Sequence, residues 1–559
     1  MKKKPTILTG ALIGGLLSLP LMALSFLGSV LIGLPFFPAF VFAFLRDRTP
    51  GEIVPRIVGV MSSSIISLNI GRVDTVAKTV EEIISLLTVF GIGLVAGAII
   101  FAILNAALKH GSPLLTGIIA GAAFGLVMTL IQASYPGLFL ADMAFMVIWT
   151  FALFMLYGLA LSYIYHTLRF SIGAAAETAD DTSASVESLD RRQFLIRVGT
   201  GAAVITAVGA GVGALLSRTD QIVSTAAAPT LTPDAMPEAL ATSTPAQRMA
   251  GGEFIPASGT RPEITPVAEH YRIDISTIIP QIPAEGYILP FTSRISADGV
   301  ERTIAELTLD QIRSNYEPIS AVVTMSCISN DVGGDLISTL EWTGARMSDI
   351  LTGMEIPAEA THLRITAADG FDEFVSLEMI NSDERIMLAY DWGGEPLIPK
   401  HGFPLRIHIP NHYGMKQPKW ITGMAFVAAD TGGYWVRRGW DAQAIAKATS
   451  VIDTAAVDDR FQDESGQIYV PIGGIAWAGD RGVSRVQVRV DEGDWADAAL
   501  KAPLSDRAWI LWRYDFPFTE GNHDLEVRCE ESDGTPQIEQ QAGTFPDGAS
   551  GYDWKRVAV

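Results

Sequence analysis

A cysteine followed by a polar, glycine-rich loop is the first feature that could carry chemistry. Cys327 closes an apolar run, Ala321–Met325, that is typical of a strand, and the loop continues to Gly333 and Gly334. A thiolate at a strand end is a soft ligand for a transition metal, and glycines let a ligand approach the backbone closely. Taken by itself, Cys327 also fits the usual role of a free cysteine, a small buried apolar group.

A second candidate is a local group of cations in an acidic protein. His401, Arg406, Lys416 and Lys419 lie within 19 residues of one another. Strands on either side of a turn at Pro410–Tyr413 would bring them to one edge, where fixed Arg and Lys donors bind anions and phosphate above all. The alternative is a solvated basic face that nearby acids offset.

A third candidate places two arginines among aromatic residues. Arg437 and Arg438 stand inside Tyr434–Trp440. They could wall an anion pocket, or they could be surface side chains stacked on the aromatic rings.

Taken together, these segments resemble the sulfite-oxidase family of molybdopterin-dependent oxidoreductases. Each motif alone has low specificity, and the resemblance rests on their order and spacing together. It covers about 270–559 and rests on Thr324–Gly334 (TMSCISNDVGG), Glu341–Leu351 (EWTGARMSDIL), His401–Pro410 (HGFPLRIHIP), Tyr413–Ile421 (YGMKQPKWI), Tyr434–Trp440 (YWVRRGW), Gly473–Trp495 and Trp509–Phe516.

The resemblance implies one molybdenum atom held by the dithiolene of a molybdopterin, with Cys327 as the cysteine ligand. It places Asn330 in a loop near the cofactor. The positions that would grip the pterin and its phosphate are His401, Arg406, Lys416 and Lys419. It also implies that the C-terminal segment is an immunoglobulin-like dimerisation domain, so a homodimer is expected.

The sequence departs from sulfite oxidases at two places. Those enzymes carry arginines just after the Cys-x-x-Asn unit, where this chain has Asp331 and Val332. Their substrate-site tyrosine would align near Phe371, which leaves an acidic pocket without a tyrosine. Because such a pocket suits a sulfite dianion poorly, Arg437 and Arg438 are the residues expected to compensate, as catalytic side chains.

Composition narrows the function classes. Asp and Glu outnumber Lys and Arg 61 to 40, a net charge of −21, which disfavours nucleic acid as a partner. The two cysteines and eight scattered histidines give no CxxC zinc site and no CxxCH segment, so no haem is expected. Electrons must then pass to or from a separate carrier, such as a cytochrome c or a membrane redox protein.

The apolar excess lies at the N-terminus. Membrane spans of roughly 20 residues are predicted at Ile7–Gly33, Ile83–Leu108, Leu114–Ala133 and Met143–Tyr165. The short apolar run Phe36–Leu45 is interpreted as interfacial or re-entrant. Glycines four apart, as in Gly93–Gly97 and Gly117–Gly121–Gly125, predict closely packed helix faces in a bundle that serves as an anchor.

A pair of arginines precedes a further uncharged run. Arg191 and Arg192 are followed by Phe194 and Leu195 and then by 198–216, a pattern typical of a twin-arginine export signal. The alternative is a positive flank on an ordinary span. Either way the arginines face the cytoplasm, a fifth span follows, and the catalytic domain lies on the extracytoplasmic side of the cell membrane. Insertion of the cofactor in the cytoplasm would explain export in the folded state.

The predicted architecture is therefore multi-domain. A transmembrane helical bundle (1–170) precedes a cytoplasmic segment with the twin arginines and fifth span (171–218) and an Ala/Thr/Pro linker (219–268). An α+β molybdopterin domain (269–450) and an immunoglobulin-like β-sandwich (451–559) follow. Strands are expected at Leu363–Ala367, Leu405–Pro410, Met424–Ala428, Ser484–Asp491, Trp509–Tyr514 and His523–Cys529.

The sequence thus favours a membrane-anchored molybdenum oxidoreductase that transfers an oxygen atom with two electrons. Sulfite is the default substrate among small oxoanions. Two alternatives remain: reduction of a sulfoxide by the same cofactor, for which Phe371 and Phe374 would supply an apolar pocket, and a non-catalytic exported module that binds a partner.

Overall fold

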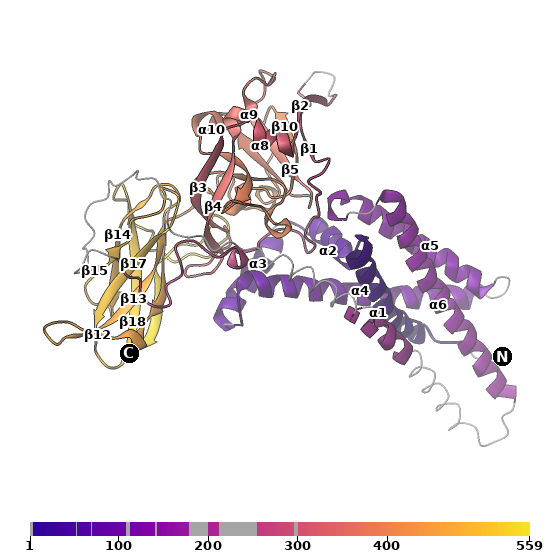
Figure 1. Ribbon diagram of the computed structural model, residues 1–559. Coiled ribbons are helices and arrows are strands. Elements are labelled where there is room, and N and C mark those ends of the chain that lie inside the picture. Colours follow the sequence, from indigo (N-terminus) through magenta and orange to yellow (C-terminus); the bar gives the residue numbers. More distant parts are fainter. Residues whose placement is uncertain are drawn as a thin grey trace. The chain divides into compact units, whose positions relative to one another are not determined.

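The computed structural model describes residues 4–51, 53–68, 70–107, 112–139, 142–177, 199–208, 210–211, 254–295 and 300–559 (Figure 1). The described chain divides into two compact units. One contains Met1–Arg48, Lys78–Ala227 and Ile275–Gln281, and the other contains Thr49–Ala77, Ala228–Asp274 and Ile282–Val559. The arginine pair at 191–192 and residues 219–253 of the expected linker lie outside the described residues.

Helices α1 (Ile7–Ile32), α4 (Val73–Ala107), α5 (Pro113–Ala133) and α6 (Met143–Glu177) carry the four apolar segments long enough to cross a bilayer. This confirms the four predicted segments, although α4 begins ten residues before the predicted span. The run at Phe36–Leu45 is the short helix α2 (Phe37–Arg48), and a 3₁₀ turn, η1 (Pro136–Leu138), lies between α5 and α6. A further apolar helix, Gly199–Val208, lies in the predicted fifth span.

The predicted glycine faces are the places where these helices touch. A Cβ added to Gly97 would lie 2.1 Å from the Gly10 carbonyl oxygen, and one on Gly117 would lie 2.4 Å from the Gly158 carbonyl oxygen. Only glycine therefore allows α1 to meet α4, and α5 to meet α6, at backbone distance.

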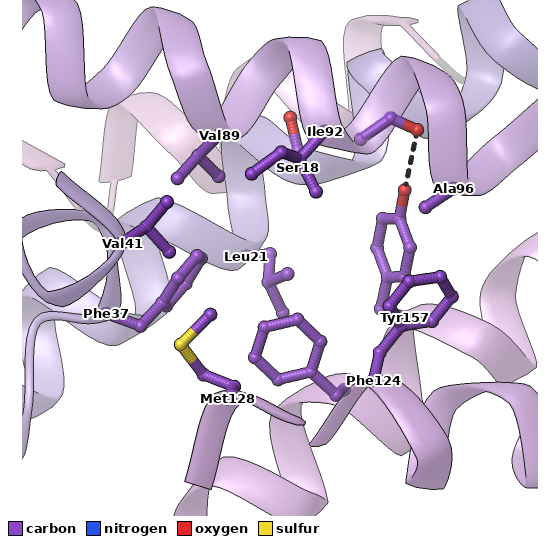
Figure 2. A pocket seen from close by; sticks show the side chains of 12 residues that line it. Ser18, Leu21, Phe37, Val41, Val89, Ile92, Ala96, Phe124, Met128 and Tyr157 are labelled. Atoms are coloured by element: carbon purple, nitrogen blue, oxygen red, sulfur yellow. Dashed lines mark hydrogen bonds between the residues drawn. The ribbon is translucent and has the colours of Figure 1, made fainter. Parts of the chain in front are cut away.

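A small cavity remains among these helices, lined by apolar side chains of α1, α2, α4, α5 and α6 (Figure 2). The Tyr157 hydroxyl at its edge donates to the carbonyl oxygens of Gly14 (3.0 Å) and Gly93 (3.1 Å). The cavity has a volume of about 40 Å³, far below the ~300–1,000 Å³ of a typical small-molecule site. The cavity is therefore better explained as imperfect packing than as a ligand site.

The second unit contains one mixed sheet, in which β1 and β10 are parallel, and three antiparallel sheets. The first sheet has the order β2-β1-β10-β5-β6, and the second has the order β3-β4-β7-β8 with β9 on β7. Their strands are β1 (Ile288–Ser293), β2 (Arg302–Thr308), β3 (Pro318–Ser326), β4 (Ile337–Arg346), β5 (His362–Ala367), β6 (Asp372–Ser376), β7 (Met387–Trp392), β8 (Glu395–Pro396), β9 (Arg406–His408) and β10 (Ile421–Val427).

Both sheets contribute to one hydrophobic core. Phe291 and Phe426 of the first sheet and Leu388 and Ile407 of the second are fully buried in it. Short helices close its edges: α8 (Leu309–Ser314), α9 (Met347–Leu351), α10 (Leu377–Ser382) and the 3₁₀ turns η2 (Val267–Glu269), η3 (Pro399–His401), η4 (Gly414–Lys416) and η5 (Val436–Arg438). The strands predicted at Ala321–Met325, Leu363–Ala367, Leu405–Pro410 and Met424–Ala428 correspond to β3, β5, β9 and β10.

The C-terminal strands form two antiparallel sheets that share a core. Their orders are β11-β13-β17-β16, with β12 on β13, and β15-β14-β18-β19. Val470, Trp512, Val488 and Leu525 meet between them. The strands are β11 (Thr449–Ala455), β12 (Phe461–Gln462), β13 (Ile468–Trp477), β14 (Val483–Val490), β15 (Ala496–Asp497), β16 (Ala499–Leu500), β17 (Ile510–Pro517), β18 (Asn522–Glu531) and β19 (Asp553–Ala558), with η6 (Val457–Asp459).

The segment Thr49–Ala77 lies between the predicted spans Ile7–Gly33 and Ile83–Leu108. It belongs to this second unit and contains helix α3 (Ile53–Leu68) and the first residues of α4. Ile65, Val73 and Ala77 share a hydrophobic cluster with Tyr271, Met325 and Cys327. Part of the membrane-rich half of the sequence is thus built into the core beside the candidate thiol.

Candidate active site

Cys327 follows directly on β3 and is 6% exposed. Its backbone N–H donates to the Leu336 carbonyl oxygen at 2.9 Å, and its Sγ lies 3.1 Å from the Ser329 hydroxyl. Burial raises the pKa of the thiol above its ordinary value, because the thiolate loses its solvation. A thiolate at this position therefore needs a bound cation or metal to stabilise it.

Asn330 fixes the shape of the loop that follows. Its side-chain Oδ1 accepts a hydrogen bond from the Leu336 N–H at 2.8 Å, and its own N–H donates to the Cys327 carbonyl oxygen at 3.0 Å. A Cβ on Gly334 would lie 2.5 Å from that Oδ1. The asparagine thus closes the loop on itself, and the glycine makes room for it.

Arg406, the first residue of β9, lies wholly inside the domain. Its guanidinium carbon is 4.5 Å from the centre of the Trp342 ring, and Nη1 donates to the His401 carbonyl oxygen at 3.3 Å. No carboxylate is paired with it in the part of the chain that the structure describes. Burial lowers its pKa to about 10.

Two histidine rings lie next to this arginine. The centroids of His270 and His401 are 4.6 Å apart, and the ring of Trp392 packs on both at 5.8 and 5.1 Å. Among the described residues His401 Nε2 is buried without a hydrogen-bond partner. Burial, reinforced by neighbouring cations that include Arg406, holds the pKa of both rings well below the ordinary value.

Lys419 completes this group of buried bases. Its Nζ lies 3.0 Å from Asp274 Oδ2 and 4.4 Å from the centre of the Trp420 ring. Burial lowers the pKa of Lys419 to about 8, although Asp274 opposes the shift. We call His270, His401, Arg406 and Lys419 the basic cluster. Such concentrated buried charge is expensive unless an anion is bound there.

Lys416 was grouped with these residues by its sequence spacing, but its ammonium has a different partner. Nζ lies 2.7 Å from Oε1 of Glu373, a carboxylate with no exposed surface. Burial raises the pKa of Glu373 even though Lys416 favours the ionised form. The charge of Lys416 is therefore already balanced within the domain.

The arginine pair of η5 is balanced in a similar way. Arg437 Nη2 lies 2.6 Å from Asp372 Oδ1, and Arg364 Nη2 lies 2.9 Å from Asp372 Oδ2. Arg438 stacks on the Tyr434 ring at 3.5 Å from its centre and donates from Nη1 to the Tyr434 carbonyl oxygen. Arg438 thus matches the stacked alternative, whereas Arg437 is in an ion pair that neither alternative included.

One expectation about this region is wrong. The segment around Phe371 was interpreted as a pocket without a tyrosine, but the buried Tyr434 packs on Phe371 with ring centroids 5.8 Å apart. Tyr434 is 63 residues away in the sequence, so an alignment position could not reveal it. Its N–H donates to the Asp372 carbonyl oxygen at 2.8 Å, which fixes it beside the acidic turn.

Sequence reasoning also missed His270 and Tyr271. Both are buried, and they follow directly on the expected linker. Burial raises the pKa of Tyr271, the Cys327 side chain adds to the shift, and a Cβ on Gly414 would lie 3.0 Å from its hydroxyl. The run His270-Tyr271-Arg272 at the start of the domain was the available signal, a dense polar stretch after a segment poor in large side chains.

Residues 282–435 match the family model described as an oxidoreductase molybdopterin binding domain. Human mitochondrial sulfite oxidase is 28% identical over 271 residues, which are 41% of this chain and 49% of that protein. This part of the chain is therefore a molybdopterin oxidoreductase domain similar to that of sulfite oxidases.

Two other similarities are more limited. The uncharacterized oxidoreductase YuiH of Bacillus subtilis is 36% identical over 99 residues, 18% of this chain and 50% of that protein. The sulfane dehydrogenase SoxCD of Paracoccus pantotrophus superimposes with a TM-score of 0.45 at 18% identity, over 60% of this chain and 94% of that one, which is too weak to bear on function. The chain spans about half the length of the sulfite oxidases it matches.

The family implies a molybdenum cofactor, and the residues present fit one. The orphaned His401 Nε2, the carboxylate-free Arg406 and the desolvated Lys419 are donors that an anionic pterin phosphate would satisfy. Cys327 would supply a soft thiolate ligand for the metal. The rings of Trp342 and Trp392 lie against the basic cluster, where they exclude water.

Proposed function

We propose that this protein is a membrane-anchored, exported molybdenum oxidoreductase that carries out two-electron oxygen-atom transfer, with sulfite as the default substrate. The observation that carries the proposal is the basic cluster: buried bases with a single hydrogen-bonded carboxylate, Asp274, beside a buried thiol. In this reading Cys327 is the metal's thiolate ligand, and His401, Arg406 and Lys419 hold the cofactor's anionic groups. Asn330 would hold the loop that follows Cys327. Lys416 would bind the cofactor through an ammonium group that is already paired with Glu373.

The bound cofactor would supply the change of oxidation state and the transferable oxygen atom. The chain's own side chains bind, orient and exclude water. Arg406, fixed between Trp342 and the His401 carbonyl, presents a preorganised guanidinium that needs no rearrangement to accept an anion. Arg437 and Arg438 are the proposed substrate-facing residues.

A sulfoxide is the second candidate substrate, and a specific observation favours it. Arg437, which was expected to face substrate, and Lys416, which was expected to hold the cofactor, are both ion-paired with buried carboxylates. A site whose charge is already balanced binds a sulfite dianion little better than a neutral molecule. Such a site therefore also admits a neutral sulfoxide. Tyr434 beside Phe371 adds apolar surface with a hydroxyl group.

Topology follows from counting membrane crossings. Thr49–Ala77 belongs to the same compact unit as the catalytic domain, so both should lie on one side of the membrane. Between them the chain passes α4, α5, α6 and the apolar segment around Gly199–Val208. An even number of crossings requires the last segment to span as well. This supports five spans, the arginine pair in the cytoplasm, and the catalytic domain outside.

The partners proposed for this enzyme are the bilayer, a small oxoanion or sulfoxide, and a separate electron carrier such as a cytochrome c or a membrane redox protein. The two C-terminal sheets are proposed to be an immunoglobulin-like module that forms a homodimer. The helical bundle is proposed to act as an anchor. No haem and no nucleic acid are expected.

Elemental analysis of the purified full chain tests the proposal. We expect close to one molybdenum per chain in the wild type and an altered molybdenum electronic spectrum in Cys327→Ser. Oxidation of sulfite with cytochrome c, compared with reduction of a sulfoxide by reduced viologen, then separates the two substrates. Folded, membrane-inserted protein without molybdenum or pterin would overturn the enzyme and leave the non-catalytic binding module.

A further inference from the structure

Helix α3 has two dissimilar faces. Pro55, Ser62 and Ile65 are buried against the domain, at intervals that place them on one side of the helix. The opposite side carries large apolar residues that are exposed: Ile53 is 46% exposed, Ile57 57%, Val60 69% and Leu68 67%. Such a row is unusual in water, where large exposed apolar patches mark an interaction site.

The inner face holds the loop that carries Cys327. The Ser62 hydroxyl donates to Asp331 Oδ2 at 3.3 Å, and Ile65 packs in the cluster that contains Cys327 and Leu336. Asp331 is one of the two residues that replace the arginines expected from the family resemblance. Here it binds the helix instead.

The start of α4 holds the other end of the same loop. The Val73 N–H donates to Asp335 Oδ2 at 3.2 Å, and Asp74 Oδ2 accepts from the Arg272 N–H at 2.9 Å. Arg272 directly follows Tyr271, which packs in the same cluster as Cys327. Two polar contacts, to Asp331 and Asp335, and a shared core therefore fix the ligand loop to a segment between two membrane spans, and a third contact joins that segment to Arg272.

Sequence connections restrict what can cover the outer face of α3. The helix ends at Leu68, α4 begins at Val73, and the predicted span within α4 begins at Ile83. At no more than ~3.6 Å per residue up to α4 and ~1.5 Å per residue along it, the C-terminal end of α3 lies within about 33 Å of that span. Its 16 residues are fewer than the ~20 that a span requires. A short helix with an apolar face that lies between two membrane spans in the sequence, as α3 lies between α1 and the span in α4, fits an interfacial helix.

We propose that α3 lies in the lipid interface with Ile53, Ile57, Val60 and Leu68 in the acyl boundary while Ser62 and Ile65 hold the Cys327 loop. The bilayer surface is then a structural partner of the active-site loop. The lipid contact stands independently of the enzyme's chemistry, whereas its importance for catalysis rests on the proposed function.

Spin labels on the full chain in phospholipid nanodiscs test the lipid contact. The native thiols Cys327 and Cys529 are 6% and 1% exposed, so labels should react at introduced cysteines. We compare Val60→Cys with Thr352→Cys, an exposed residue after α9, by collision with oxygen and with a water-soluble nickel chelate. Oxygen dissolves in the acyl region and the chelate does not.

We expect the ratio of oxygen to nickel accessibility to be at least severalfold higher at position 60 than at position 352. Equal ratios would place α3 in water and overturn the proposal. Low accessibility to both reagents at position 60 would mean that protein, such as a second copy of this chain, covers the face, and would overturn it equally.

Hydrogen exchange tests the connection to the loop without depending on activity. Ile57→Asp combined with Val60→Asp should release α3 from lipid and speed amide exchange across 327–336 severalfold, while exchange in β13 and β17 stays unchanged. Ile538→Asp, an equally exposed apolar site in the C-terminal region, is the matched control. Unchanged exchange at 327–336 would refute the coupling. Molybdenum content, measured in parallel, reports separately on the proposed function.

Discussion

The helical unit and the catalytic unit bury polar groups in opposite ways. Among the helices, contact is made by backbone on backbone: Gly97 approaches Gly10, and Gly117 approaches Gly158. The catalytic domain instead concentrates charge, with Arg406 and Lys419 in its interior beside two histidines. The first arrangement costs nothing in desolvation, while the second is costly until an anion binds. We therefore expect the reaction to take place at the basic cluster, where the domain buries charge at a cost in stability.

The largest effect should follow removal of a charge from the basic cluster. Arg406→Met should lower the molybdenum content of purified protein at least tenfold, because an unpaired buried anion costs about 3–5 kcal/mol. Arg364→Met is the matched control, since Arg364 is 46% exposed and pairs with Asp372. Equal molybdenum content in the two variants would contradict the idea that the catalytic unit, unlike the helical unit, buries charge in order to bind an anion.

Next in size is the packing of the helices. Gly97→Ala should destabilise the bundle by about 1–3 kcal/mol, because its Cβ would overlap the Gly10 carbonyl. Gly91→Ala, on the same helix with open space around it, should be neutral within about 1 kcal/mol. Thermal unfolding in detergent measures both. Molybdenum content should change in neither variant, and a loss in the folded Gly97→Ala protein would mean that the bundle does more than anchor.

The pH dependence of cofactor retention is the third prediction. The pKa of Lys419 is lowered to about 8, so below pH 8 its charge is present and favours an anion. Above pH 8 the site must take up a proton to bind, and retention should weaken by up to about tenfold per pH unit. Dialysis at pH 7 to 9 followed by molybdenum analysis measures it, and Lys419→Met should remove the dependence.

The cofactor-free domain should respond with the opposite sign. Between pH 8 and the ordinary lysine pKa of 10.5 the unfolded chain binds the proton and the folded chain does not. Stability of the cofactor-free form should therefore rise with pH in that window. A fall in stability over the same window would show that Lys419 is not the titrating group.

The smallest effect concerns substrate charge. Glu373→Gln keeps the shape of the residue but leaves the charge of Lys416 unbalanced. We expect the KM for sulfite to fall about threefold, and the KM for a neutral sulfoxide to stay constant, because an unbalanced positive charge acts mainly on charged ligands. Glu378→Gln, an exposed carboxylate on α10, is the control. Equal changes for both substrates would place the Lys416–Glu373 pair away from the substrate.

Much of this architecture could be predicted from the sequence because its signals are local. Uninterrupted apolar runs gave α1, α4, α5 and α6, and alternation gave β14 and β18. The spacing of His401, Arg406 and Lys419 predicted a shared edge, and the structure brings these three together. Each of these inferences needed only residues that are neighbours in sequence.

The remainder depends on contacts between distant segments. Nothing near Lys416 or Arg437 indicates that Glu373 and Asp372 neutralise them, because the acids lie on β6. The packing of Ile65 against the cysteine cluster joins residues more than 250 positions apart. Similarly, His270 becomes meaningful only when η3 places His401 beside it.

The placement of Thr49–Ala77 within the catalytic unit has a consequence for biogenesis. Ribosomes complete this segment long before the residues after 254, so under the proposed topology it waits outside the cytoplasm while the domain matures inside. The cofactor would be inserted while the Cys327 loop is still open on one side. After translocation, packing of Thr49–Ala77 against the Cys327 loop would then cover the cofactor. The cofactor could thus be inserted before export, and its dissociation would be opposed after export.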